Sequence, residues 1–235
     1  MSQFTYIGTE LELFAEAKNW KKYIRLLLRK YIKGDVLEVG AGIGSHTKLL
    51  SCYPYSKWLC LEPDPKLLQA LEYSIESNGI TNCYVENGTI DSLKPEDLFD
   101  SILYIDVLEH IRNDQKEVSK VSQHLKTDGY LIILGPAHQW LFTPFDAAIG
   151  HYRRYNKQTL KGVMPDEIEV IKLAYLDCVG LLASFGNKLL LRQSQPTLKQ
   201  IKLWDNFMVP MSKILDTALG YRFGKSILLV GRKRF

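Results

Sequence analysis

The feature that most constrains this chain is a regular alternation of short apolar segments with longer amphipathic ones between residues 36 and 136. Strand-like segments occupy 36–40, 57–63, 83–87, 100–108 and 129–136, with helical patterns at 65–79 and 115–125. A further helical pattern covers 9–32, with Thr9 as a possible N-cap. This spacing predicts a parallel sheet with helices on both faces, and right-handed crossovers favour a doubly wound order. Ligands bind beyond the carboxyl ends of such strands, so the residues that follow each strand are the candidates for function.

Composition restricts the remaining choices. The chain has 235 residues, 46% hydrophobic and 24% charged, which excludes disorder and predicts one domain over 1–235. Its four cysteines form no CxxC pair and are expected to be buried thiols of a reducing compartment. No secretory leader pattern and no run of 18 apolar residues is present, so the expected location is cytoplasmic.

A glycine-rich turn follows the first strand. It reads Glu38-Val39-Gly40-Ala41-Gly42-Ile43-Gly44, with GxGxG rather than GxGxxG spacing. Glycines permit a tight turn, and the helix after it offers free N–H groups to a ligand. Glu38 stands where a dehydrogenase strand normally carries an apolar residue, and a carboxylate suits a ligand with a cationic amino group. Glu62 ends the second strand, the position from which an acid hydrogen-bonds a ribose diol. A plain turn and a solvated charge are the alternatives.

Four motifs in order resemble class I S-adenosylmethionine-dependent methyltransferases: VLEVGAGIGSHT, LCLEPDPKLL, FDSILYIDVLEHI and LKTDGYLIILGP. The resemblance covers residues 30–136. It implies an α/β, Rossmann-like, doubly wound seven-stranded sheet with an antiparallel C-terminal hairpin, expected at 167–177 and 226–234. It further implies an N-terminal lid helix (1–33), a cofactor-binding core (34–136) and substrate-side loops with a helical insertion between strands six and seven (137–225).

The resemblance also implies the cofactor, S-adenosylmethionine, its product S-adenosylhomocysteine, and their contacts. The positions carried over are Tyr6, Glu38, Gly40, Ala41, Gly42, Gly44, Glu62, Pro63, Gly88, Thr89, Ile90, Asp106 and Val107. Thr89 stands where many relatives have Asp, so the adenine amino group would be met by a hydroxyl or by main chain. Tyr6 is a lid contact or an ordinary packing aromatic.

Two clusters offer groups for chemistry. Asp106 to His110, after the fourth strand, resembles a stretch of ubiquinone-biosynthesis O-methyltransferases. There, an acid-x-x-Glu-His set can hold a divalent ion, so Asp106, Glu109 and His110 are an alternative metal set. The favoured prediction is that no metal binds and that Glu109 and His110 begin a helix and bond locally.

The second cluster follows the fifth strand in a D-x4-H-x-R-R-Y pattern and resembles a subset of class I methyltransferases with a GHxRRY loop. We predict His151 as a general base, with Asp106 and His110 as further catalytic groups. The predicted substrate-binding residues are Trp140, Arg153, Arg154 and Tyr155. The alternative is a lid whose charges satisfy one another.

The C-terminal end is basic. From Lys188 onward, ten basic residues against two acids give a net charge of +8. Apolar residues recur at helical spacing from Ile201 to Leu215, with Pro210 expected to bend or divide the helix. Three interpretations stay open: a helical pair packed on the core, the wall of an apolar pocket, and an interfacial helix in peripheral contact with an anionic membrane.

The predicted function is methylation of a small molecule, most directly O-methylation of an apolar, aromatic or sugar- or lipid-linked acceptor. N-methylation of an amine, an NAD-dependent oxidoreductase and a non-catalytic cofactor-binding protein are the alternatives. A nucleic-acid partner is not expected, because the basic residues are dispersed and no Asp-Pro-Pro-aromatic motif follows the fourth strand.

Overall fold

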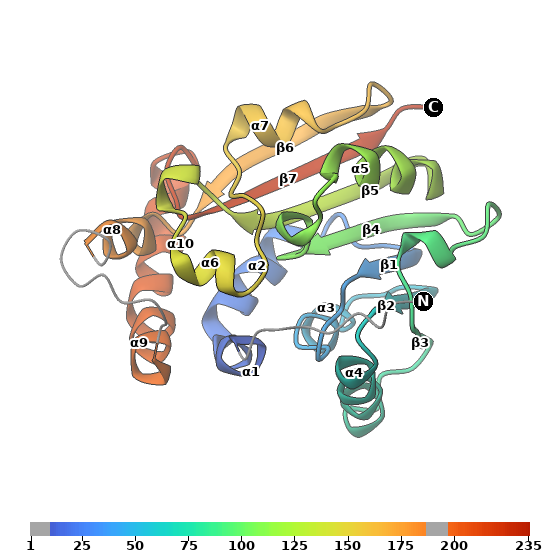
Figure 1. Ribbon diagram of the computed structural model, residues 1–235, viewed down its shortest axis with the longest axis horizontal. Coiled ribbons are helices and arrows are strands. Elements are labelled where there is room, and N and C mark those ends of the chain that lie inside the picture. Colours follow the sequence, from blue (N-terminus) through green and yellow to red (C-terminus); the bar gives the residue numbers. More distant parts are fainter. Residues whose placement is uncertain (1–9, 187–196) are drawn as a thin grey trace.

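A single twisted sheet organises the chain (Figure 1). The computed structural model describes residues 10–186 and 197–235. The strands are β1 (Asp35–Val39), β2 (Lys57–Leu61), β3 (Cys83–Glu86), β4 (Phe99–Ile105), β5 (Leu125–Pro136), β6 (Ile168–Leu176) and β7 (Ser226–Lys233). Their order is β3-β2-β1-β4-β5-β7-β6, with β7 antiparallel to both of its neighbours. The predicted seven-stranded, Rossmann-like sheet with its antiparallel C-terminal hairpin is confirmed.

Helices connect these strands and cover both faces of the sheet (Figure 1). They are α1 (Glu10–Ala15), α2 (Lys18–Leu28), α3 (Thr47–Leu50), α4 (Pro65–Ser77), α5 (Asp114–Val121), α6 (Pro144–Ala148), α7 (Lys157–Gly162), α8 (Cys178–Gly186), α9 (Leu198–Leu203) and α10 (Val209–Ala218). None of the helices in the described ranges has the length and apolar content that a bilayer span needs.

Two hydrophobic cores lie on opposite faces of the sheet, because neighbouring residues of a strand point in opposite directions. Val36 of β1 belongs to the core under α2, α4 and α10, whereas Leu37 belongs to the core under α5 and α7. Parallel strands buried on both faces read as continuous apolar runs, which is why the sequence identified them.

The N-terminal helix differs from the prediction. A single helix over 9–32 is wrong, because the chain breaks after α1 and starts again as α2. The carboxylate of Asp205 accepts hydrogen bonds from the backbone N–H groups of Asn19 (2.9 Å) and Trp20 (2.8 Å), which satisfies the new helix start. Thr9, the expected cap, lies outside the described residues.

The thiols also differ in part from the expectation. All four cysteines are free, but Cys52 is exposed, while Cys60 and Cys178 are buried and Cys83 is half-buried. Cys52 follows the single turn of α3.

The helical insertion between β6 and β7 is tied to the rest of the fold by a buried carboxylate. Asp216 of α10 accepts hydrogen bonds from the Tyr23 hydroxyl (2.9 Å) and from the backbone N–H groups of Asp177 (2.7 Å) and Cys178 (3.0 Å). The helix continues from α9 through the π-helical turn η6 (Trp204–Met208) into α10, and Pro210 lies in the first turn of α10, so it does not end the helix. The hydrogen bonds to Asp216 join α2, the end of β6 and α10.

Candidate active site

The glycine turn after β1 lies against the ends of β2 and β4. The N–H groups of Gly40 and Ala41 both donate to the Leu61 carbonyl, at 2.8 and 3.1 Å. Gly40 has φ of 66°, and a Cβ added there would lie 2.8 Å from a Val107 methyl group. Gly42 and Gly44 are also left-handed, at 58° and 75°. Only glycine adopts such a turn without strain while packing this closely.

Glu62 closes this turn from the end of β2. Its buried carboxylate accepts hydrogen bonds from the N–H groups of Gly42 (2.8 Å) and Asp64 (2.9 Å). Burial raises the pKa of Glu62 above its usual range. Two backbone donors leave lone pairs on a carboxylate that accepts about four hydrogen bonds, so the group retains capacity for a ribose diol.

The loops after β2 and β3 are brought together as expected for an adenosine site. Gly88 N–H donates to the Glu62 carbonyl at 3.3 Å. The Asn87 amide donates to the carbonyls of Glu62 (2.9 Å) and Pro63 (3.1 Å). Thr89 caps a 3₁₀ turn through Asp91, and Ile90 is buried behind it. Asn87 joins the two loops, and sequence reasoning missed this role because it placed the residue inside the third strand.

Glu38 is held by protein groups. Its carboxylate accepts from the Thr47 hydroxyl (2.8 Å) and the Trp58 indole N–H (3.0 Å), and it is buried. Burial raises the pKa of Glu38 to about 7, although these hydrogen bonds oppose the shift. Glu38 therefore supports the glycine turn from the layer between β1, β2 and α3.

Asp106 follows β4 in the left-handed conformation, with φ of 55°. Its side chain reaches solvent, yet the surrounding protein atoms displace water and raise its pKa to about 6. Asp106 is within electrostatic reach of His151 and Lys225.

A carboxylate–histidine pair lies within electrostatic reach of Asp106. Asp146 of α6 bonds to His151 Nδ1 at 2.9 Å. It also accepts from the Arg154 guanidinium, at 2.8 and 2.9 Å, and from Thr143. Burial alone would raise the pKa of Asp146, but the bonds from His151 and Arg154 hold it well below its usual range. Such a pair fixes the His151 tautomer with Nε2 as the acceptor.

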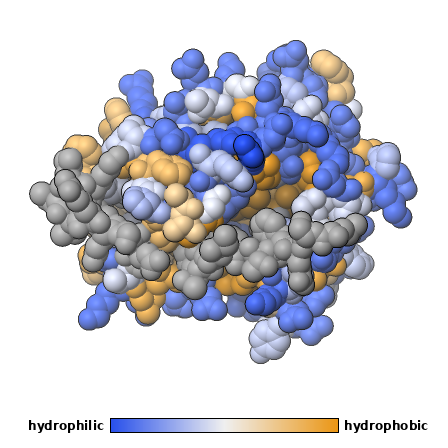
Figure 2. All heavy atoms as spheres, viewed as in Figure 1, coloured by the Kyte–Doolittle hydropathy of each residue, from blue (hydrophilic) through white to orange (hydrophobic). Residues whose placement is uncertain are grey.

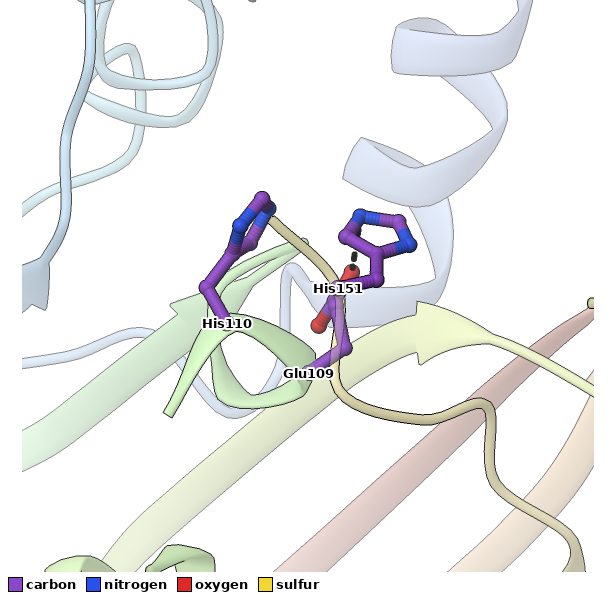
Figure 3. Close-up of side chains that lie close together, drawn as sticks. All are labelled: Glu109, His110 and His151. Atoms are coloured by element: carbon purple, nitrogen blue, oxygen red, sulfur yellow. Dashed lines mark ion pairs between the residues drawn. The ribbon is translucent and has the colours of Figure 1, made fainter. Parts of the chain in front are cut away.

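Glu109 and His110 meet His151 from the turn after β4 (Figure 3). His151 Nε2 lies 3.9 Å from Glu109 Oε1, and the two imidazole rings are in edge contact at 4.5 Å. Burial lowers the pKa of His110 to about 4 and raises that of Glu109 well above its usual range. Neither carboxylate oxygen of Glu109 has a hydrogen-bond partner among the described residues.

These three residues form a set that fits a metal ion. Ligand atoms of Glu109, His110 and His151 lie within 4.8 Å of one another. Asp106 is not part of this group, so the alternative ligand set differs from the sequence-based one, with His151 in its place. The Asp146–His151 bond is the support that a metal-binding imidazole usually has on its other nitrogen.

The residues predicted to bind substrate divide into two kinds. Arg153 pairs with Asp114 at 2.5 Å, Arg154 with Asp146, and Tyr155 is buried with its hydroxyl on Asp114 at 2.7 Å. The two arginines of this loop are therefore paired with carboxylates of α5 and α6. Trp140 is 48% exposed and contacts Phe185 of α8 edge-on, so it remains open to a ligand.

Sequence reasoning missed the organising role of Asp146. The signal for it was the D-x4-H spacing, which one turn of α6 converts into a hydrogen bond across the loop. Tyr6, the predicted lid contact, lies outside the described residues.

The sheet has the strand order of the class I methyltransferase fold, with a glycine turn after β1 and an acid at the end of β2. Residues 37–131 match the family model described as a methyltransferase domain. Ubiquinone biosynthesis O-methyltransferase of Rickettsia canadensis is 30% identical over 101 residues, covering 43% of this chain and 42% of that protein. The chain thus matches less than half the length of this curated relative.

Solved structures share the whole fold. The YcgJ protein of Bacillus subtilis has a TM-score of 0.62 at 20% identity, covering 91% of this chain and 99% of that one. Coclaurine N-methyltransferase, solved with N-methylheliamine and S-adenosylhomocysteine, has a TM-score of 0.63 at 16% identity, covering 98% and 83%. The relatives include both O- and N-methyltransferases, so they leave the acceptor atom open.

Proposed function

We propose that this chain transfers a methyl group from S-adenosylmethionine to a hydroxyl of a small molecule, with His151 as the general base. One observation carries the proposal: the Asp146–His151 pair stands beside Asp106, at the carboxyl end of β4, where the fold class places the reacting methyl. A neutral amine needs no base before attack, whereas a hydroxyl gains from losing its proton, so the pair favours O-methylation.

The proposed cofactor contacts are those that the family resemblance implies, and the turns described above bring these residues together. Gly40 to Gly44 would receive the methionine moiety, Glu62 the ribose diol, and Gly88, Thr89 and Ile90 the adenine edge. S-adenosylmethionine supplies a methyl group already activated by its sulfonium. The chain's own task is then to align the acceptor with that methyl and to hold the proton that leaves.

The His151 imidazole takes the proton that the acceptor loses. Nδ1 is engaged by Asp146, so Nε2 accepts the proton from the acceptor hydroxyl as the oxygen attacks the methyl carbon. Asp146 remains ionised because its pKa is depressed, and it stabilises the imidazolium that forms. Trp140 would offer an aromatic wall to an apolar acceptor.

Calorimetric titration with S-adenosylmethionine, S-adenosylhomocysteine and NAD tests the cofactor assignment. We expect micromolar binding of the two sulfur compounds and none of NAD. Glu62→Ala should weaken binding at least tenfold, and the exposed Glu72→Ala on α4 should leave it unchanged. Binding of NAD alone would overturn the proposal.

A second candidate role for the cluster is metal binding, favoured by the two unpartnered oxygens of Glu109. Glu109, His110 and His151 would hold a divalent ion that lowers the pKa of a bound hydroxyl. Calorimetry with Zn²⁺ and Mn²⁺ on the wild type and on Glu109→Gln separates the roles. Metal binding lost in the variant would favour this candidate; full activity in chelator with no metal binding favours the general base.

A further inference from the structure

The helical insertion leaves one side of its long helix uncovered. Residues 198–218 run as α9, η6 and α10, and Ile201, Trp204 and Val209 pack into the core. The opposite side carries five large apolar residues that we call the apolar stripe. They are Leu203, Phe207, Met211, Ile214 and Leu215, with exposed fractions of 52%, 65%, 54%, 72% and 40%.

The spacing of the stripe places its members on one face. The separations of four, four and three residues from Leu203 to Ile214 match the turn of a helix, and Leu215 lies beside Ile214; the wider η6 turn keeps Leu203 in line with Met211. Figure 2 shows some hydrophobic residues at the lower left, where Figure 1 places α9. The five exposed residues therefore follow one another along the helix.

The charges around the stripe have one sign. Lys199, Lys202, Lys213 and Arg222 are all exposed. The acids between residues 197 and 225, Asp205 and Asp216, are buried and accept hydrogen bonds from α2, β6 and Tyr23. This described segment thus exposes four cations and no carboxylate.

Charge decides what can cover such a face. A second copy of the chain would place cations against cations at the rim of the interface, which opposes association. A bilayer with anionic lipids meets both features at once, since acyl chains accept the apolar stripe and headgroups pair with the lysines.

We propose that the apolar stripe and its four cations form a docking surface for an anionic membrane, with α9 and α10 lying in the plane of the interface. The chain would bind peripherally and reversibly. This proposal rests on the exposed face alone and does not depend on the methyl acceptor.

Vesicle co-sedimentation of the full chain tests the proposal. Vesicles of phosphatidylcholine alone are compared with vesicles that also contain phosphatidylglycerol, each at low and high salt. We expect binding to the anionic vesicles at low salt, with a partition coefficient at least tenfold lower at high salt and on the neutral vesicles.

Two double variants separate the contributions. Phe207→Ser with Ile214→Ser removes apolar contact, and Lys202→Glu with Lys213→Glu reverses charge; each should lower the partition coefficient at least tenfold. All four positions are exposed, so folding should persist, and circular dichroism checks it. The control pair lies on α4: Tyr73→Ser, which is 73% exposed, and Lys66→Glu, neither of which should affect binding.

Three results would overturn the proposal. They are no binding at low salt, equal binding to neutral and anionic vesicles, and binding that neither double variant reduces. A dimer seen by sedimentation velocity and dispersed by Phe207→Ser would instead assign the stripe to contact between copies.

Discussion

At the scale of single residues, the fold places ionisable groups where burial changes their protonation. Glu38 is buried at the start of the glycine turn, with a pKa raised to about 7. Asp146 is also buried, but its five donor bonds shift its pKa the opposite way. The difference lies in the donors: hydroxyl, indole and thiol groups around Glu38, an imidazole and a guanidinium around Asp146. Ionised Glu38 therefore lowers the stability of the fold, whereas ionised Asp146 raises it.

Glu38 predicts a pH dependence of stability. Its pKa is about 4.3 in the unfolded chain and about 7 in the fold, so between these values the native state binds more protons. The free energy of unfolding should therefore fall as pH rises from about 4.5 to 7, by roughly 3 kcal/mol from this group. Urea denaturation of the wild type and of Glu38→Gln measures it. Equal slopes with pH in both proteins would contradict the prediction.

His151 predicts a catalytic effect without a loss of fold. His151→Ala should lower kcat by roughly 10²-fold or more once an acceptor is known, because the attacking hydroxyl loses its base. S-adenosylmethionine affinity should stay within a few-fold, since His151 is not among the predicted cofactor contacts. Lys161→Ala, an exposed change on α7, is the control. An unchanged rate in His151→Ala would remove His151 from the mechanism.

At the scale of elements, the candidate site is built at the junctions between strand and helix. The turn after β1 packs its glycine backbone against Val107 and its N–H groups against the end of β2. The turns after β2 and β3 are joined through Asn87. Each turn is short and is fixed by a neighbouring strand, so the site is largely preformed.

The glycine turn predicts a difference between two similar substitutions. Gly40→Ala and Gly79→Ala both place alanine at positive φ, 66° and 60°, which costs about 1 kcal/mol. Only Gly40 meets a neighbour, Val107 at 2.8 Å, so its variant should lose a further 1–3 kcal/mol or so of unfolding free energy. Chemical denaturation compares the two, and calorimetry should show weaker cofactor binding for Gly40→Ala alone. Equal losses would mean that the Val107 contact is unimportant.

The sequence predicted the strands and turns better than the long-range contacts between them. Apolar runs located the strands, and the four motifs located the turns, because both signals are local. The break between α1 and α2 was missed because Asp205, which satisfies the new helix start, lies 186 residues from Asn19. The pairing of His151 with Glu109 likewise depends on two loops meeting at the sheet edge, which no local pattern encodes.

At the scale of the molecule, α2 near the start of the sequence and the helical insertion near its end are joined. Asp216 of α10 links α2 to the end of β6, and Asp205 of η6 caps α2. The N-terminal helix and the C-terminal insertion therefore pack as one layer on one face of the sheet.

This link predicts a large stability loss from one buried change. Asp216→Ala leaves the Tyr23 hydroxyl and the N–H groups of Asp177 and Cys178 without their acceptor, so the free energy of unfolding should fall by about 3–5 kcal/mol. Glu169→Ala, which breaks an exposed pair with Arg234, should leave the free energy of unfolding nearly unchanged. Thermal and urea denaturation give both values. A loss below about 1 kcal/mol for Asp216→Ala would show that the link is weak.

The π-helical turn η6 bears on how this chain tolerates changes of length. A π-helical turn holds more residues than the 3.6 of an α-helical turn, so η6 takes up an extra residue within the helix. Deleting one residue of η6 should therefore convert the wide turn into an ordinary α-helical turn and leave Ser212 and Asp216 facing their partners. A deletion within α10, where no wide turn can absorb it, would instead rotate the residues that follow by about 100° and carry Asp216 away from Tyr23.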